Sequence, residues 1–329
     1  MIRKVINFIL ILIWLVRSIE AQPFPVMQLL ELQIQAMGTT ITLKAYVPKD
    51  LDQSRLTRSF TSKLDSLVFL LSDYEDYNLV QQLATLSGKG SPLTVDRPLI
   101  EIMQTGSKIF RLTHGKFDVT IGKVTHFWRE QFRRGRIPSR KKMKRMLRYV
   151  GMDKVRIDSV QSSLYLSKRG MELDFGGIGK GYIGDQLAAH LENFGVHSFL
   201  IDLGGDLIAG DPPPSQVGWK IRCEWLSGEL IISNEALATS GPDYQFFYYR
   251  GARYSHIIDP HTGWAIKAPA TCTVIANNGS TADAMASALP LLDELSIQAL
   301  QKELNLSFAL VNLTGLISSP DFVTRIRKL

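Results

Sequence analysis

Cysteine is almost absent from this sequence, because only Cys223 and Cys272 occur among its 329 residues. Two isolated cysteines exclude a disulfide-rich scaffold and a cysteine-based zinc site, although outside the cytoplasm these two could pair with each other. Repeats, low-complexity tracts and apolar runs of about 20 residues are also missing, which excludes solenoid repeats and a comfortable membrane-spanning helix. With 45% hydrophobic and 21% charged residues, the composition is that of a globular protein of one large domain or two ordinary ones.

A basic character spread over the whole chain is lacking as well, despite a formal net charge of +7. Residues 129–148 contain ten Lys or Arg and one acid, so this segment carries +9 and the remainder about −2. We therefore expect no general nucleic-acid-binding surface. The basic segment itself is either a solvated helical face or a contact to anionic lipid, a membrane surface or an acidic membrane partner.

The first residues are typical of an export signal. Arg3 and Lys4 precede an apolar stretch at residues 5–16, and Ala21 offers a small residue for cleavage. We expect a signal peptide at residues 1–21, followed by one domain at residues 22–329. An uncleaved membrane anchor and a buried N-terminal helix are the alternatives. Both the signal peptide and the anchor place the working protein outside the cytoplasm.

The apolar spacing along the rest of the chain predicts strands and helices in irregular alternation. Strands are expected at 31–46, 163–175, 198–210, 219–225, 229–233 and 271–276, and helices at 52–71, 99–112, 140–150, 186–194 and 280–292. This order favours an α+β fold with mixed sheets flanked by helices.

A glycine-rich segment, Gly176 to Tyr182, lies between a predicted strand and a predicted helix. Backbone N–H groups at a helix start, together with the charge of Lys180, would suit a phosphate group. A purely structural turn explains the glycines equally well. Residues 179–184 also match the G-x-G-x-x-G pattern of Rossmann dinucleotide sites, with Asp202 downstream, so this third interpretation stays open.

The segment from Ser255 to Gly263 places His256 at the end of a strand, shortly before an Asp-Pro turn. Histidine titrates near neutral pH and is the commonest general base in enzymes. A turn histidine bonded to the backbone is the alternative. His261 lies inside the turn, where we expect it to be exposed to water.

Asp283 and Ser287 are four residues apart in a predicted helix and therefore share one helical face. Their hard oxygen atoms are ligands that Mg²⁺ accepts, with phosphate and water completing the coordination. The alternative is a helix cap made by Thr281 or Asp283.

Seven segments carry a resemblance to one known family when they are taken together and in order. They are MGTTITLKAY, LSDYEDYNLVQQL, GKFDVTIGKV, LDFGGIGKGYIGDQLAAHL, LIDLGGDLIAG, ATSGPDYQFFYYRGARYSHIIDPHTG and VIANNGSTADAMASALPLL. In this combination the chain resembles the ApbE family of FAD:protein FMN transferases over roughly residues 31–320. The resemblance implies a two-lobed α+β fold with a cleft for FAD between the lobes.

The resemblance also implies an activity and a set of site residues. Family members use Mg²⁺ to transfer the FMN half of FAD to a Thr or Ser hydroxyl of an acceptor protein, with release of AMP. His256 would be the base; Asp283, Ser287 and the Gly177 carbonyl would bind Mg²⁺. The FAD contacts implied are Met37, Tyr74, Lys116, Phe117, Asp118, Asp174, Lys180 and Ile258.

Some positions depart from the family pattern. Ser287 stands where the family usually has Thr, which keeps the hydroxyl, whereas Asn78 and Ala84 replace a usual Ser and Asn after the LSDY segment. Many relatives are lipoproteins, but this chain has no lipobox cysteine. We expect an exported protein, periplasmic or attached to the outer face of the inner membrane, whose acceptor is a membrane redox-complex subunit. The alternatives are a Mg²⁺-dependent FAD pyrophosphatase, a non-catalytic FAD-binding protein and, more remotely, a Rossmann oxidoreductase.

Overall fold

The computed structural model describes residues 26–72, 77–223, 225, 228–241, 246–266, 270–313 and 315–328. The predicted signal peptide and Tyr74 lie outside these residues. Helices and strands alternate irregularly along the chain, so the predicted α+β class is confirmed.

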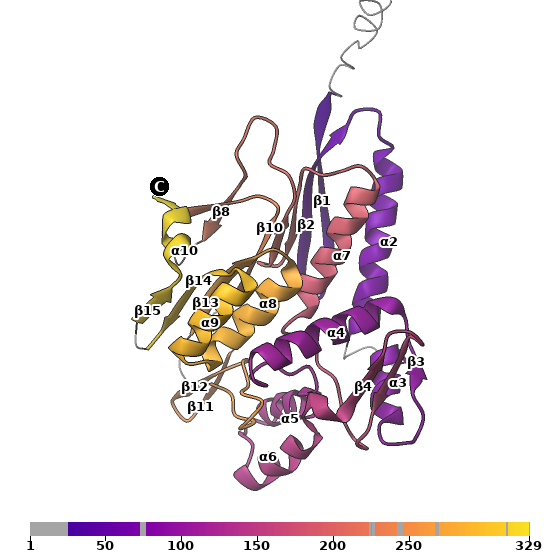
Figure 1. Ribbon diagram of the computed structural model, residues 1–329, viewed down its shortest axis with the longest axis vertical. Helices are drawn as coiled ribbons and strands as arrows, with labels where there is room; N and C mark the ends of the chain where they lie inside the picture. Colours follow the sequence, from indigo (N-terminus) through magenta and orange to yellow (C-terminus); the bar gives the residue numbers. More distant parts are fainter. Residues whose placement is uncertain are drawn as a thin grey trace, which may run out of the picture.

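An eight-stranded sheet forms the centre of the molecule (Figure 1). Its strands, in spatial order, are β1 (Met27–Ala36), β2 (Thr39–Pro48), β6 (Phe199–Leu203), β7 (Leu207–Ala209), β10 (Glu235–Ser240), β13 (Thr271–Ala276), β14 (Ser307–Asn312) and β15 (Gly315–Ser318). Successive side chains of a strand point to opposite faces. Val274 accordingly packs in the main core, while the next residue, Ile275, packs in a second cluster on the other face.

Helices cover one face of this sheet, and a small sheet covers part of the other. The helices are α2 (Gln53–Leu71), α7 (Gly179–Asn193), α8 (Gly279–Ala288) and α9 (Glu294–Leu304), seen in front of the strands in Figure 1. The small sheet contains β8 (Trp219–Cys223), β9 (Gly228–Ile232) and β16 (Ile326–Lys328), with α10 (Pro320–Arg325) beside it. Trp219 and Phe322 bring this layer into the second apolar cluster.

The lower part of the molecule in Figure 1 is built from shorter elements. They are α3 (Leu79–Leu86), β3 (Leu93–Thr94), α4 (Arg97–Leu112), α5 (Gly122–Arg133), α6 (Arg140–Met146), β4 (Val155–Asp158), β5 (Ser163–Leu166), β11 (Phe246–Tyr249) and β12 (Ala252–Ser255). Trp128 of α5, Met143 of α6 and Tyr254 of β12 share a third apolar cluster. This cluster fixes α5 and α6 against the segment that follows β12.

The predicted mixed sheets were wrong, because every strand pair formed by the described residues is antiparallel. A parallel contact occurs as an isolated bridge between Ile121 and Glu172, outside the named strands. Short turns join many neighbouring strands, and a short turn can connect only antiparallel strands. The sequence pattern showed where strands lie but not their direction.

Two strand boundaries also differ from expectation. The single strand predicted at 31–46 is a hairpin, β1 and β2, whose turn is Met37-Gly38 with positive φ at both residues. The strand predicted at 163–175 ends at Leu166, and its hairpin partner is β4, which precedes it. Residues 171–175 instead run toward α5 as part of the site described below.

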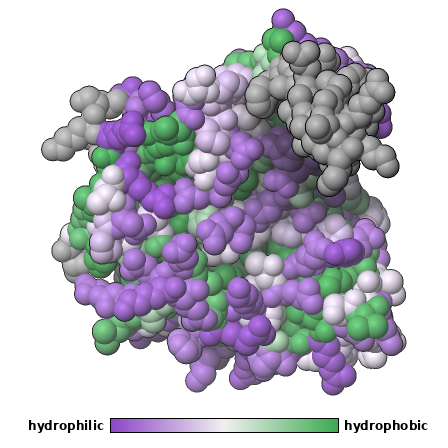
Figure 2. All heavy atoms as spheres, turned by 45° about the horizontal axis from the view of Figure 1, so that its top comes forward, coloured by the Kyte–Doolittle hydropathy of each residue, from purple (hydrophilic) through white to green (hydrophobic). Residues whose placement is uncertain are grey.

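The surface, the helix lengths and the two cysteines complete the description of the fold. On the face drawn in Figure 2, hydrophobic side chains occur in small groups between hydrophilic bands. Among the described residues, no helix is both long enough and apolar enough to cross a membrane. Cys223 and Cys272 are both free thiols, so the disulfide considered above is not formed here.

Candidate active site

A cavity of about 290 Å³ lies where the lower part of the molecule meets the start of α7 and the end of α8. Five separate segments of the chain line it, including α5, the segment before α7 and the loop after β12. Of the residues singled out from the sequence, it brings together Lys116, Phe117, Asp118, Asp174, Gly177, His256, Ile258 and Ser287. Their roles toward a ligand stay predictions.

Two loops far apart in the sequence are joined at the edge of this cavity. Nζ of Lys116 lies 3.0 Å from Oδ2 of Asp259, and Nε2 of His261 lies 3.0 Å from the carbonyl oxygen of His114. The indole N–H of Trp128 also donates to the carbonyl of Gly263. The amino group of Lys116, which the resemblance assigned to FAD, thus pairs with a carboxylate of the loop at residues 256–263, which follows β12 and is called the histidine loop below.

His256 follows β12 directly and its side chain is exposed while lining the cavity. Nε2 lies 3.5 Å from Oγ of Ser240, at the outer limit for a hydrogen bond. A base in this position can meet both a ligand in the cavity and a second protein arriving from solvent. His261 is exposed in the turn, as predicted.

Asp174 is buried, and protein groups satisfy both of its oxygen atoms. Oδ2 accepts hydrogen bonds from Thr125 and Arg129 of α5, at 2.6 and 3.1 Å, and Oδ1 accepts from the backbone N–H of Gly176. Glu172 bonds to His126, on the same helix, at 2.6 Å. The carboxylates of the 172–174 segment therefore hold α5 in place, and Arg129 reaches the cavity beside Asp174.

Asp118 is buried in a turn of its own. Its Oδ1 accepts from the backbone N–H and the hydroxyl of Thr120, at 2.8 and 2.6 Å. Burial raises the pKa of Asp118 to about 6, while the bonds from Thr120 act in the opposite direction. Phe117 beside it packs on the glycine segment, because a Cβ on Gly177 would lie 3.3 Å from its ring.

Lys180, in the first turn of α7, forms an ion pair with a buried carboxylate that the sequence did not indicate. Its Nζ lies 2.7 Å from Oδ2 of Asp206, which is 2% exposed and also accepts from the backbone N–H of Thr239. Burial alone would lower the pKa of Lys180, but Asp206 and Asp283 raise it. The sequence shows Asp206 directly after the Gly204-Gly205 turn, but an acid after a glycine turn does not by itself indicate a partner for Lys180.

Asp283 and Ser287 share a face of α8, as their spacing predicted. Oδ2 of Asp283 accepts from the backbone N–H of Gly181 at 3.1 Å, and Oγ of Ser287 would be 3.3 Å from a Cβ on Gly177. Burial and the neighbouring carboxylate of Asp206 raise the pKa of Asp283. The proposed helix cap by Thr281 or Asp283 was wrong, because the side chain of Asn278 caps α8.

The oxygen donors available to a Mg²⁺ ion at this place are few. No group of three or more His, Cys, Asp or Glu suited to a metal occurs among the described residues. Mg²⁺ is commonly held by only one or two carboxylates, with phosphate and water in its other positions. One buried carboxyl and one hydroxyl on the same face of α8, with Gly177 next to that hydroxyl, are therefore a donor set that fits Mg²⁺ bound together with a phosphate ligand.

The starts of α7 and α8 touch each other through two glycines. A Cβ on Gly181 would lie 2.0 Å from the carbonyl oxygen of Gly279, so no larger residue fits. Asp185, also missed in the sequence, accepts from the backbone N–H groups of Gly279 and Ser280 at 2.5 and 2.9 Å. The glycines of residues 179–184 thus allow helix packing. A Rossmann site needs a parallel sheet, so that interpretation was wrong.

Three of the predicted site residues, Met37, Lys180 and Asp283, do not line the cavity. Asp283 is buried one helical turn before Ser287, which does line it. Met37 occupies the β1–β2 turn, and this turn meets the turn after β6, because a Cβ on Gly204 would lie 2.6 Å from Oγ1 of Thr39. Asp206 follows that second turn. Met37 and Lys180 are therefore connected through neighbouring turns at one end of the sheet.

Comparison with known proteins agrees with this arrangement. The ApbE family profile matches residues 37–310. An FAD:protein FMN transferase of Buchnera aphidicola is 27% identical over 300 residues, covering 86% of this chain and 85% of that protein. The enzyme of the same name from Klebsiella pneumoniae is 30% identical over 242 residues, covering 70% and 72%.

Solved structures share the fold. The ApbE protein of Thermotoga maritima superposes with a TM-score of 0.82 at 23% identity, covering 91% of this chain and 100% of that one. The flavin transferase ApbE from Vibrio cholerae gives 0.78 at 22%, covering 91% and 100%. Since the family profile spans most of the sequence, this chain belongs to the ApbE family.

Proposed function

We propose that this chain transfers FMN from FAD to a Ser or Thr hydroxyl of an acceptor protein, with Mg²⁺ bound, and releases AMP. The shared name of the relatives, FAD:protein FMN transferase, supports flavin transfer as the activity. The observation that supports the details most strongly is the shared cavity, which the exposed His256 lines together with Gly177 and Ser287.

The reaction needs a base that both substrates can reach. His256 would take the proton from the acceptor hydroxyl, because an unassisted hydroxyl is a poor nucleophile. The hydroxyl oxygen forms a bond to the FMN-side phosphorus, and the bond from that phosphorus to the bridging oxygen breaks. AMP leaves with the bridging oxygen and the electron pair of that bond. The exposure of His256 suits a macromolecular acceptor, which cannot enter a closed pocket.

Charge on the diphosphate has to be neutralised for this attack. Asp283, Ser287 and the Gly177 carbonyl would hold Mg²⁺, which supplies Lewis-acid stabilisation of the phosphate oxygens. Lys180 adds a positive charge beside them, and its pairing with Asp206 keeps the ammonium oriented. Asp283 in turn receives the Gly181 N–H, which holds its carboxylate at the junction of α7 and α8.

The acceptor and location belong to the same proposal. We infer an exported enzyme, periplasmic or attached to the outer face of the inner membrane, from the apolar segment at residues 5–16 and the polar residues after it. A membrane redox-complex subunit with its flavin-bearing domain on that side would be the acceptor.

The test is incubation of the purified protein with FAD, MgCl₂ and a purified candidate acceptor subunit. We expect a fluorescent acceptor band in a denaturing gel, an acceptor mass increased by one FMN unit, and one AMP released per flavin attached. EDTA should abolish all three signals, and their persistence in EDTA would refute the metal requirement. Release of FMN and AMP without labelled acceptor would identify a pyrophosphatase instead.

A further inference from the structure

Nine basic side chains form an exposed surface on the end of α5, the following loop and α6. This basic surface consists of Arg133, Arg134, Arg136, Arg140, Lys141, Lys142, Lys144, Arg145 and Arg148, all of them exposed. Residues 131–148 contain no acid, and Glu130, just before them, pairs with Arg134 at 2.6 Å. The charges of the surface therefore face solvent largely uncompensated by their own segment.

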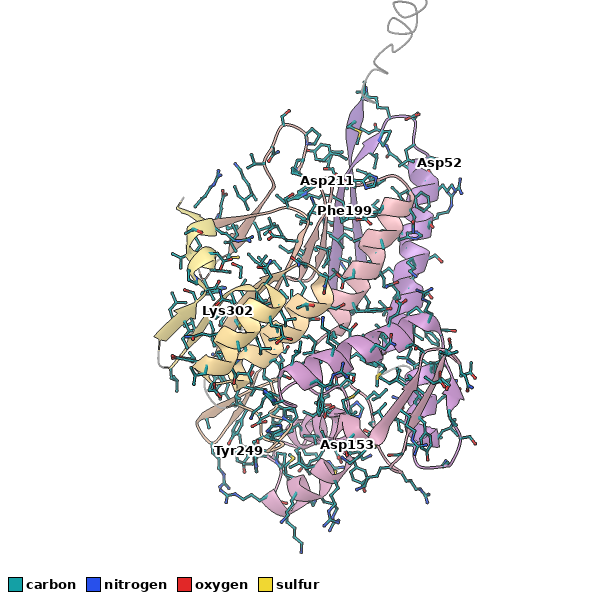
Figure 3. All side chains as sticks on the ribbon, viewed as in Figure 1. Asp52, Asp153, Phe199, Asp211, Tyr249 and Lys302 are labelled. Atoms are coloured by element: carbon teal, nitrogen blue, oxygen red, sulfur yellow. The ribbon has the colours of Figure 1, made fainter. Side chains whose placement is uncertain are left out.

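The surface is carried by a well-packed element. Met143 is 1% exposed, and Met146 and Leu147 are partly buried in the cluster that contains Trp128. A Cβ on Gly263 would lie only 2.4 Å from the sulfur of Met143, so α6 touches the histidine loop directly. All the apolar residues of α6 thus face the protein, and its outer side offers charge alone. Figure 3 shows long nitrogen-tipped side chains projecting from α6 into solvent.

The basic surface also adjoins the cavity. Phe132 lines the cavity, and Arg133 and Arg134 follow it as the last residue and the C-cap of α5. The histidine loop lines the cavity through His256 and contacts α6 through Gly263. A macromolecule lying on the basic surface would therefore be close to the exposed imidazole.

The surface lies far from the point where the described chain begins. In Figure 1 the start of β1 is at the top of the long axis, and α6 is at the bottom. A membrane bound through the residues that precede β1 would be at the opposite end from the basic surface. An amphipathic membrane contact would also need outward apolar residues, which α6 does not offer.

We propose that the basic surface is a docking site for an acidic segment of the acceptor protein, which brings the acceptor hydroxyl to His256. This inference rests on the proposed function and adds to it how the acceptor is recognised. Complementary charge at the rim of an active site accelerates encounter and selects partners, and its effect weakens as salt screens it.

The test uses a matched pair of quadruple variants of the full chain. The first is Arg140→Gln, Lys141→Gln, Lys144→Gln and Arg145→Gln. The control is Arg58→Gln, Lys220→Gln, Arg222→Gln and Lys302→Gln, which removes the same charge from exposed positions elsewhere. Both variants should bind FAD like the unmodified protein, since none of these residues lines the cavity.

The first measurement is fluorescence anisotropy of a labelled peptide rich in Asp and Glu, with a single Thr at its centre. The α6 variant should bind this peptide about tenfold more weakly than the control variant at low salt, and the difference should shrink at high salt. The second measurement is flavin transfer to the acceptor subunit, where KM should rise about tenfold for the α6 variant at unchanged kcat. Equal peptide affinity and equal KM for the two variants would overturn the proposal.

Two further arms separate this proposal from others. If the α6 variant loses binding to phosphatidylserine-containing vesicles but keeps peptide affinity and KM, the surface contacts anionic membrane and the docking proposal fails. If no acceptor is flavinylated by the unmodified protein while peptide binding still depends on α6 and on salt, the proposed function fails and the docking site stands.

Discussion

Nζ of Lys180 lies 2.7 Å from Oδ2 of Asp206, and this pair joins the first turn of α7 to the residue just before β7. Asp206 is almost fully buried, so its charge depends on the lysine. Removing one partner of a buried ion pair leaves the other charge uncompensated, which is far costlier than losing an exposed pair.

We therefore expect Lys180→Gln, which leaves the buried Asp206 carboxylate without its counter-charge, to lower the free energy of unfolding by about 3 kcal/mol. Urea denaturation followed by circular dichroism measures this change. Lys44→Gln is the matched control, because Lys44 forms an ion pair with Glu31 at 3.2 Å in which both side chains are about half-exposed. Equal losses in the two variants would show that the pair with Lys180 contributes nothing special.

The contact between Gly181 and Gly279 predicts that two neighbouring glycines of α7 differ in how well they tolerate alanine. Gly181→Ala places a methyl group 2.0 Å from a backbone oxygen, so α7 and α8 have to move apart. The expected loss of stability is about 3 kcal/mol or more, as for a strongly overpacked core position.

Gly179→Ala should be harmless by comparison, since its Cβ would meet only Phe175 at an ordinary 3.6 Å. Thermal unfolding of both variants at the same pH checks the difference. If the Gly181→Ala and Gly179→Ala proteins unfold at the same temperature, α7 and α8 do not pack as described.

The roles assigned to the two histidines of one loop predict different kinetics. His256→Ala should lower the rate of flavin transfer by about 10²–10⁴-fold, the usual contribution of a general base, and leave FAD affinity nearly unchanged. His261→Ala should retain most activity, because His261 is exposed in the turn and bonds only a backbone carbonyl among the contacts described. Single-turnover transfer with FAD fluorescence titration separates the two effects. Comparable rates for both variants would remove His256 from the mechanism.

Asp118 predicts how stability depends on pH. Burial raises its pKa to about 6 in the folded protein, from 3.8 when exposed. The folded state therefore holds this proton more tightly, and stability contributed by Asp118 falls as pH rises from about 4 to about 6.

Over that range the loss is about 3 kcal/mol, and it stays constant above pH 6. Asp118→Asn has no such proton, so its stability relative to the unmodified protein should improve between pH 4 and pH 7. Denaturant unfolding at both pH values measures the difference, with Asp158→Asn, at the exposed end of β4, as control. A pH-independent difference would contradict the raised pKa.

The local elements and the shared face of the predicted metal ligands follow from the amino-acid sequence alone. Apolar residues at helical spacing, such as Leu56, Phe60 and Leu64, form the buried side of α2, because helix periodicity is a local property. Asp283 and Ser287 share one face of α8 for the same reason. The ordered motifs were also sufficient to indicate the family.

Contacts between groups that are distant in the sequence became known only from the folded structure. Strand direction, the partner of Lys180, the bond from Lys116 to Asp259 and the contact of Gly181 with Gly279 all join segments remote in sequence. Local spacing carries no information about such pairs, since they form only when the sheet and its covering helices close around one core. The tertiary structure also turned the basic run at 129–148 into an outward surface beside the cavity, because the apolar residues of α6 pack against α5 and the histidine loop.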